Sequence, residues 1–190
     1  PVDEKLLGRE FGEIEYFNGG IWATYGTNKI CIIEEDSLTY TIDTSSIISD
    51  EVISLKTIGD KIYVGSTGKN VIAYSNHSKY TLYSATVEGI NDIMLDSNGL
   101  LWVCADNGMG YFTDTTNFVK ANDCEIDSYL SSMIQDYEGN YWIASNRMGV
   151  LLLSKSKFTD LNMSIGMPEA IVNTVYTYRN HKLQGSGNHL

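Results

Sequence analysis

The sequence predicts an all-β protein built from repeated units of four short antiparallel strands. Three observations carry this prediction. An aromatic residue recurs at a nearly constant interval along the 190 residues, and apolar residues alternate with a period of two. Glycine is frequent, at 17 residues, whereas proline occurs only twice. Period-two alternation is typical of strands with one buried face, and glycine suits the tight turns between them.

The repeat is about 40 residues long. Trp22, Tyr63, Trp102 and Trp142 each follow a turn, at spacings of 41, 39 and 40, and Leu183 takes the same place after a further 41. Four strands in a unit of this length are typical of a β-propeller blade, which stacks on its neighbours and shares a core with them. We predict one propeller over residues 1–190, with blades at 11–43, 51–84, 90–121, 130–162 and a partial blade at 171–190.

The strands of each blade follow from the alternation. First strands are predicted near 13–17, 52–57, 90–95, 131–136 and 172–177, and second strands carry the aromatic residue, as at 61–65 and 101–105. Third strands follow at 71–74, 110–112 and 150–153, and fourth strands at 80–83, 118–119 and 158–161. The turn before the aromatic contains Gly19-Gly20, Asn98-Gly99 or Gly139-Asn140. Such pairs tolerate positive φ and favour a tight hairpin.

Eight residues at these repeated positions are predicted to be structural. The aromatic residues should pack between blades, the aspartates should accept backbone N–H bonds within the turn, and the glycines should allow the turn. These residues are Trp22, Tyr63, Trp102, Trp142, Asp96, Asp136, Gly99 and Gly139.

Composition argues against several functions. There are 24 acidic and 13 basic residues, a net charge of −11, which disfavours nucleic acid and anionic membrane surfaces. No apolar run approaches the roughly 20 residues of a membrane span. Neither the cysteines (31, 104, 124) nor the histidines (77, 181, 189) have the spacing of a metal site, and we expect no metal, cofactor or catalytic residue.

The sequence motif of the repeat resembles that of a known family. Asp-x-x-Gly-x-x-Trp, followed by a glycine before the next strand, occurs at 96–110 and 136–149. This is similar to the two-component regulator propeller repeat, although that family has Gly-Thr where Cys104-Ala105 and Ala144-Ser145 stand. An NHL-type repeat remains the alternative. The resemblance implies an extracytoplasmic ligand-sensing region of a membrane-anchored bacterial regulator, a histidine kinase, hybrid regulator or diguanylate cyclase. Its ligands would be small molecules such as carbohydrates, and its output module would lie outside these residues.

Candidate ligand-binding residues lie in the loops at one end of the predicted blades. Amide, guanidinium and phenol groups suit sugar or carboxylate contacts through hydrogen bonds and ring stacking. The candidates are Lys69, Asn70, Asn107, Asn146, Arg147 and Tyr129. The alternatives are a scaffold for protein partners and, less favoured, a propeller lyase or hydrolase, which would need clustered histidines or acids.

The fifth copy ends within its second strand, so we expect the chain to be part of a longer propeller. Residues 1–10 are too few to replace two strands and their turn, which disfavours a closed five-bladed ring. An open blade edge would then favour self-association.

Overall fold

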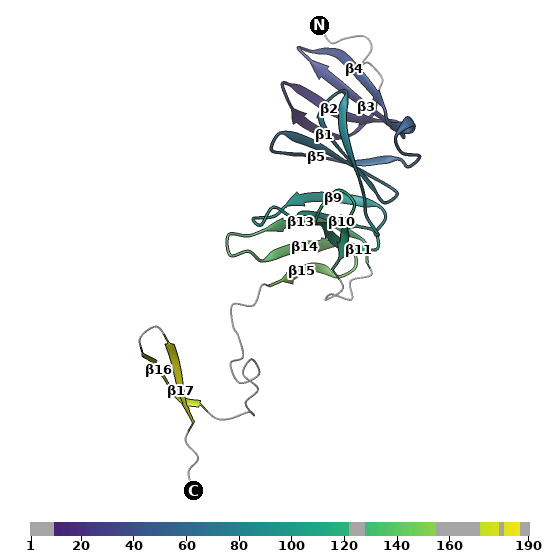
Figure 1. Cartoon of the computed structure of the whole chain (residues 1–190). Helices are drawn as coiled ribbons and strands as arrows, with labels where there is room; N and C mark the ends of the chain where they lie inside the picture. Colours follow the sequence, from purple (N-terminus) through teal and green to yellow (C-terminus); the bar gives the residue numbers. More distant parts are fainter. Residues whose placement is uncertain (1–9, 122–127, 155–171, 179–180, 187–190) are drawn as a thin grey trace. The chain divides into compact units, whose positions relative to one another are not determined.

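The computed structural model describes residues 10–121, 128–154, 172–178 and 181–186 (Figure 1). The chain divides into two compact units, Pro1–Ser154 and Lys155–Leu190, which are considered separately.

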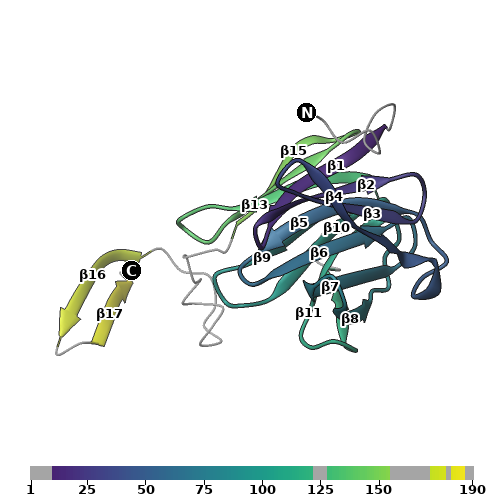
Figure 2. The same ribbon diagram turned by 90° about the horizontal axis from the view of Figure 1, so that it is seen from above.

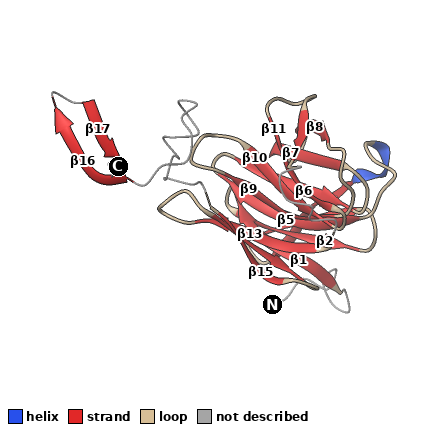
Figure 3. Cartoon of the chain, turned by 90° about the horizontal axis from the view of Figure 1, so that it is seen from below, coloured by secondary structure: helices blue, strands red, loops and turns tan. Residues whose placement is uncertain are grey.

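The first unit contains four consecutive antiparallel sheets within its described residues. Three have four strands, in the orders β1-β2-β3-β4, β5-β6-β7-β8 and β9-β10-β11-β12, and the next has three, β13-β14-β15. The strands are β1 (Phe11–Phe17), β2 (Gly20–Tyr25), β3 (Lys29–Glu34), β4 (Ser37–Asp43), β5 (Val52–Ile58), β6 (Lys61–Ser66), β7 (Asn70–Asn76), β8 (Lys79–Ser84), β9 (Ile90–Leu95), β10 (Leu101–Ala105), β11 (Gly108–Phe112), β12 (Phe118–Lys120), β13 (Leu130–Gln135), β14 (Tyr141–Ser145) and β15 (Gly149–Leu153). A 3-10 turn, η2 (Thr44–Ser46), follows β4 and is blue in Figure 3.

The second unit contains an antiparallel hairpin of β16 (Val172–Tyr178) and β17 (His181–Ser186). Its pairing starts at Val172↔Ser186 and has a one-residue bulge after that pair. The β5–β6 pairing starts at Val52↔Ser66 and has its bulge at the same place. The hairpin therefore has the register of the first two strands of a blade.

The predicted fold class is confirmed: the protein is all-β, with consecutive antiparallel sheets of about 40 residues. The first strands begin at residues 11, 52, 90, 130 and 172, within two residues of the predicted positions. The fourth strand predicted at 158–161, and most of the N-terminal segment considered for ring closure, lie outside the described residues.

First strands of successive sheets lie side by side, so the sheets of the first unit pack face to face in chain order. Figure 2 shows β5, β9 and β13 next to one another. Polar contacts join them: Ser54 Oγ donates to the Ile90 carbonyl at 2.7 Å, and Asp92 Oδ2 accepts from Ser132 Oγ at 2.7 Å. The first strands β5 and β9 are thus each bonded to the next blade as well as to their own.

Three buried apolar clusters fill the spaces between neighbouring sheets. Trp22, Tyr63 and Trp102 are 3%, 7% and 6% exposed and belong to these clusters, as predicted. The predicted core position of Trp142 stays a prediction, because within the described residues of the first unit its side chain is 41% exposed. The reason is that its face of the β13–β15 sheet has no further described sheet of the first unit against it.

Asp96 and Asp136 cap their turns, as the sequence predicted. Asp96 Oδ1 accepts from the Asn98 and Leu100 N–H groups at 2.8 and 2.9 Å. Gly99 follows with φ +81°, a conformation that glycine adopts without strain, and Gly139 has φ +87° at the equivalent place.

The second carboxylate oxygen has a role that was not predicted. Asp96 Oδ2 accepts from the Trp102 indole at 3.1 Å and from the Tyr141 hydroxyl of the next blade at 2.8 Å. Asp136 Oδ2 likewise accepts from the Trp142 indole at 3.0 Å. The six-residue spacing from aspartate to tryptophan therefore fixes the indole ring against the turn.

These contacts favour ionised carboxylates. Burial opposes ionisation of Asp96, but the bonds from Leu100, Tyr141, Trp102 and Asn98 outweigh it and hold its pKa below the ordinary value. The Trp142 hydrogen bond is the largest influence on Asp136, and with the bonds from Asn140 and Glu138 it lowers that pKa to about 2 against some desolvation.

Candidate functional site

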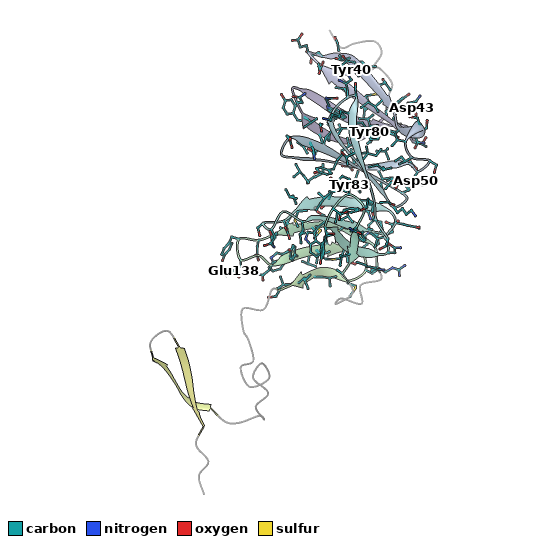
Figure 4. The ribbon with its side chains drawn as sticks, viewed as in Figure 1. Tyr40, Asp43, Asp50, Tyr80, Tyr83 and Glu138 are labelled. Carbon is teal, nitrogen blue, oxygen red and sulfur yellow. The ribbon has the colours of Figure 1, made fainter. Side chains whose placement is uncertain are left out.

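The sheets of the first unit have two distinct ends. At one end lie the loops between second and third strands and the connections between blades, here called the loop rim (residues 26–28, 44–51, 67–69, 85–89, 106–107, 128–129 and 146–148). At the other end lie the turns between first and second strands. In Figure 4, Asp43 and Asp50 mark the loop-rim side, and Glu138 marks the opposite side.

Backbone hydrogen bonds tie the loops of the rim to the blade connections. The Ala85 N–H donates to the Lys69 carbonyl at 2.8 Å, and the Gly89 N–H donates to the Thr67 carbonyl at 2.9 Å. The Asp106 N–H reaches the Glu88 carbonyl at 3.0 Å. The loop rim is therefore a framework of hydrogen-bonded backbone segments, which can hold side chains in defined positions.

Two of the predicted ligand-binding residues help to build this framework. Asn70 Nδ2 donates to Asp50 Oδ2 at 3.2 Å, and Asn107 Oδ1 accepts from the Glu88 N–H at 2.9 Å. A ligand that bound either amide would have to share its hydrogen-bonding atoms with Asp50 or with the Glu88 N–H.

The other four predicted residues are exposed on the rim. Tyr129 and Asn146 are brought together, since the Asn146 N–H donates to the Tyr129 carbonyl at 3.3 Å. The side chains of Lys69, Asn146 and Arg147 have no hydrogen-bond partner among the described residues. Lys69 belongs to the second blade and Arg147 to the fourth, so the structure distributes these groups over different blades.

A polar groove of about 400 Å³ at the first blade was missed by sequence reasoning. It lies between the β2–β3 loop and the end of β4, with Asn28, Lys29, Asp43 and Ser45 in its lining. The Ser45 hydroxyl bonds to Asp43 at 2.6 Å and is the largest influence lowering the pKa of Asp43, followed by the Ser45 N–H. The hairpin register could have indicated this groove, because Lys29 pairs with Asp43 across β3 and β4.

A second groove, of about 380 Å³, crosses the first strands near their turn ends. We call it the first-strand groove. Its lining includes Lys56 and Ile58 of β5, Met94 and Leu95 of β9, and Met133 and Gln135 of β13. Residues about 40 positions apart meet here, and no local motif marks them.

The acidic, histidine and cysteine side chains of the described residues bear on metal binding and nucleophilic chemistry. Within them, no group of three or more His, Cys, Asp and Glu side chains is placed to hold a metal ion. Cys104 is fully buried, and burial raises the pKa of its thiol, which disfavours the nucleophilic thiolate. A search of the same residues for a helix long and apolar enough to cross a membrane finds none.

The fold is that of the β-propellers, as comparison with solved structures shows. The chain is similar to the extracellular domain of the putative hybrid two component system BT3049 from B. thetaiotaomicron, with a TM-score of 0.63 and 18% identity, over 95% of this chain and 26% of that one. It is also similar to the WD40 beta propeller domain of Doa1, with a TM-score of 0.61 and 14% identity over 78% of this chain and 52% of that one.

A third similar structure is a streptogramin B lyase, with a TM-score of 0.59 and 17% identity over 76% of this chain and 54% of that one. The chain thus spans between about a quarter and half of the length of these propellers. No protein-family model and no curated protein sequence matches the chain. The similar structures therefore include an extracellular domain of a putative hybrid two component system, a WD40 domain and a lyase, all with one architecture.

Proposed function

We propose that this chain is a non-catalytic, ligand-sensing propeller segment of a bacterial signal-transduction regulator. The observation that carries the proposal is the similarity over 95% of the chain to an extracellular domain of a putative hybrid two component system. The Asp-x-x-Gly-x-x-Trp motif of the third and fourth repeats supports the same class of regulator. An extracytoplasmic location on a membrane-anchored parent protein belongs to this proposal.

The loop rim is the proposed sensing surface for a small polar ligand such as a carbohydrate. Its unpartnered Lys69, Asn146 and Arg147 side chains offer directional donors, and Tyr129, 38% exposed, offers a ring face. The hydrogen-bonded framework beneath them limits the ordering cost of binding.

A thermal-shift screen of the full chain against neutral sugars, sugar acids and small carboxylates tests the proposal. A ligand present at 100 times its Kd adds about 2.7 kcal/mol of stability. For a protein of this size that amounts to a rise in Tm of roughly 5–10 °C. Arg147→Ala should remove the shift, whereas Lys79→Ala, on the outermost strand β8, should retain it. A ligand whose shift survives Lys69→Ala, Asn146→Ala and Arg147→Ala would contradict binding at the rim.

A scaffold for protein partners is the second candidate function. Within the described residues of the first unit, the outer face of the fourth blade favours it, because Ile134, Trp142 and Leu152 form a cross-strand row that is 62%, 41% and 53% exposed. Exposed apolar rows of this kind are common in protein interfaces. Trp142→Ser would abolish capture of such a partner and leave a rim ligand's thermal shift unchanged.

A further inference from the structure

The first-strand groove combines an apolar floor with a single cationic group. Ile58, Leu95 and Met133 line it from three successive blades, and Leu95 is 47% exposed to it and to solvent. Met94 and Met133 add flexible thioether chains, which adapt to ligands of irregular shape. The groove lies at the turn end of the first strands, opposite the loop rim.

Lys56 is the charged residue of this lining. Its side chain is exposed and has no hydrogen-bond or ion-pair partner among the described residues. An unpaired ammonium beside apolar side chains is complementary to an anion that carries a hydrocarbon group. The anionic group can pair with the ammonium, and the hydrocarbon group can contact the apolar side chains.

The polar groups of the groove disfavour a sugar at this place. Gln135 already uses its amide: Oε1 accepts from the Ser97 N–H at 2.8 Å, and Nε2 donates to the Gly139 carbonyl at 3.5 Å. Lys56 and the remaining amide positions of Gln135 are then the side-chain groups left to meet several hydroxyl groups. A hydroxyl buried without a partner would reduce affinity.

The size of the groove limits the ligand. Its volume of about 380 Å³ lies at the lower end of the range for small-molecule sites. At about 30 Å³ for each water-sized group, the ten non-hydrogen atoms of octanoate need roughly 300 Å³. A carboxylate with a chain of about eight carbons therefore fits.

We propose that the first-strand groove is a second ligand site, which takes a small amphipathic monocarboxylate. The carboxylate pairs with the Lys56 ammonium, and the alkyl or aryl body lies over Met94, Met133, Leu95 and Ile58. This site is independent of the loop rim, so ligand binding at either place can be measured without the other.

Methyl NMR of the full chain labelled at the methionine methyl groups tests this site with octanoate as the probe. Met94 and Met133 line the groove, whereas Met148 is 54% exposed on the loop rim and serves as the internal control. Leucine substitutions assign the signals. Octanoate should shift the Met94 and Met133 signals in a saturable way and leave the Met148 signal unchanged.

Charge variants test the role of Lys56. Lys56→Met keeps the length of the side chain and should weaken octanoate binding about tenfold, the loss typical of a charged hydrogen bond. Lys56→Arg should restore most of the affinity, and Lys79→Met on β8 is the matched control. Octylammonium, which reverses the ligand charge, should bind at least tenfold more weakly than octanoate.

Three results would overturn the proposal. They are equal octanoate affinities for Lys56→Met and Lys79→Met, equal binding of octylammonium and octanoate, and shifts at Met148 without shifts at Met94 and Met133. A sugar-dependent thermal shift that Arg147→Ala removes would support the rim function in every one of these cases.

Discussion

Replacing Asp96 by asparagine removes a charge that joins a turn, an indole ring and the neighbouring blade. Asparagine can still accept the Asn98 and Leu100 N–H bonds through its oxygen. Its amide nitrogen, however, would face the Trp102 indole N–H and the Tyr141 hydroxyl, which now bond to Asp96 at 3.1 and 2.8 Å. The Tyr141 hydroxyl can rotate to accept a hydrogen bond from the amide, but the indole N–H can only donate one.

The expected cost follows from these contacts. Leaving the Trp102 indole N–H unsatisfied in a residue that is 6% exposed costs about 1–3 kcal/mol. Weakening the other charge-assisted bonds brings the loss to about 2–4 kcal/mol. With a urea m-value of about 2 kcal/mol/M, the unfolding midpoint should fall by roughly 1–2 M.

Urea unfolding followed by tryptophan fluorescence measures this loss, and Asp136→Asn is the matched control. Asp136 accepts equivalent bonds from Glu138, Asn140 and the Trp142 indole, but Trp142 is 41% exposed, so water can replace a lost contact. Asp136→Asn should therefore lower the midpoint by much less. Equal losses in the two variants would refute the argument that blade-to-blade burial makes Asp96 important.

The pH dependence of the same variant gives an independent check. The folded pKa of Asp96 is lowered, so its ionised form stabilises the fold above its unfolded pKa of about 3.9. This stabilisation is lost as pH falls through the lower, folded pKa. The difference between wild type and Asp96→Asn should be full at pH 6 and should shrink below about pH 4.

Three further predictions follow from burial and close contact. Trp102→Ala should cost about 3–5 kcal/mol in urea unfolding, as large core truncations do, and Trp142→Ala about half as much because 41% of that side chain already contacts solvent; equal costs would contradict the observed difference in burial. Cys104 should react with a thiol reagent in native protein far more slowly than in urea, since it is fully buried and its pKa is raised; fast native labelling would disagree. Gly65→Ala would bring a Cβ to 2.6 Å from the Ile90 carbonyl oxygen and should cost about 1–3 kcal/mol by differential scanning calorimetry, so an unchanged Tm would count against that packing.

Strand positions could be predicted from the sequence because their causes are local. The alternation around Trp102 and the Asp96-to-Gly99 turn are set by residues within one hairpin, and the same hairpin recurs about 40 residues later. The capping role of Asp96 was predictable for the same reason. Its bond to Tyr141 was not, because that residue lies 45 positions away and belongs to the next blade.

The candidate site was predicted less completely, since its properties depend on partners distant in sequence. Asn70 and Asn107 have residue types that suit a ligand, yet Asp50 and Glu88 from preceding connections occupy their amides. The exposure of Trp142 depends on which sheets cover it and not on its own repeat. The first-strand groove arises only when three blades are stacked.

The three buried clusters have a consequence for how the first unit opens. Each cluster belongs to one pair of neighbouring sheets, so the two middle sheets each take part in two clusters and the two outer sheets in one. In such a nearest-neighbour array, unfolding is expected to begin at an outer sheet, which has only one interface, and to proceed blade by blade. Amide protons of β6 and β10 should then exchange last. A conformational change in one outer blade would affect the other outer blade only through the successive interfaces between neighbouring sheets. The four sheets are therefore coupled pairwise through three separate cores.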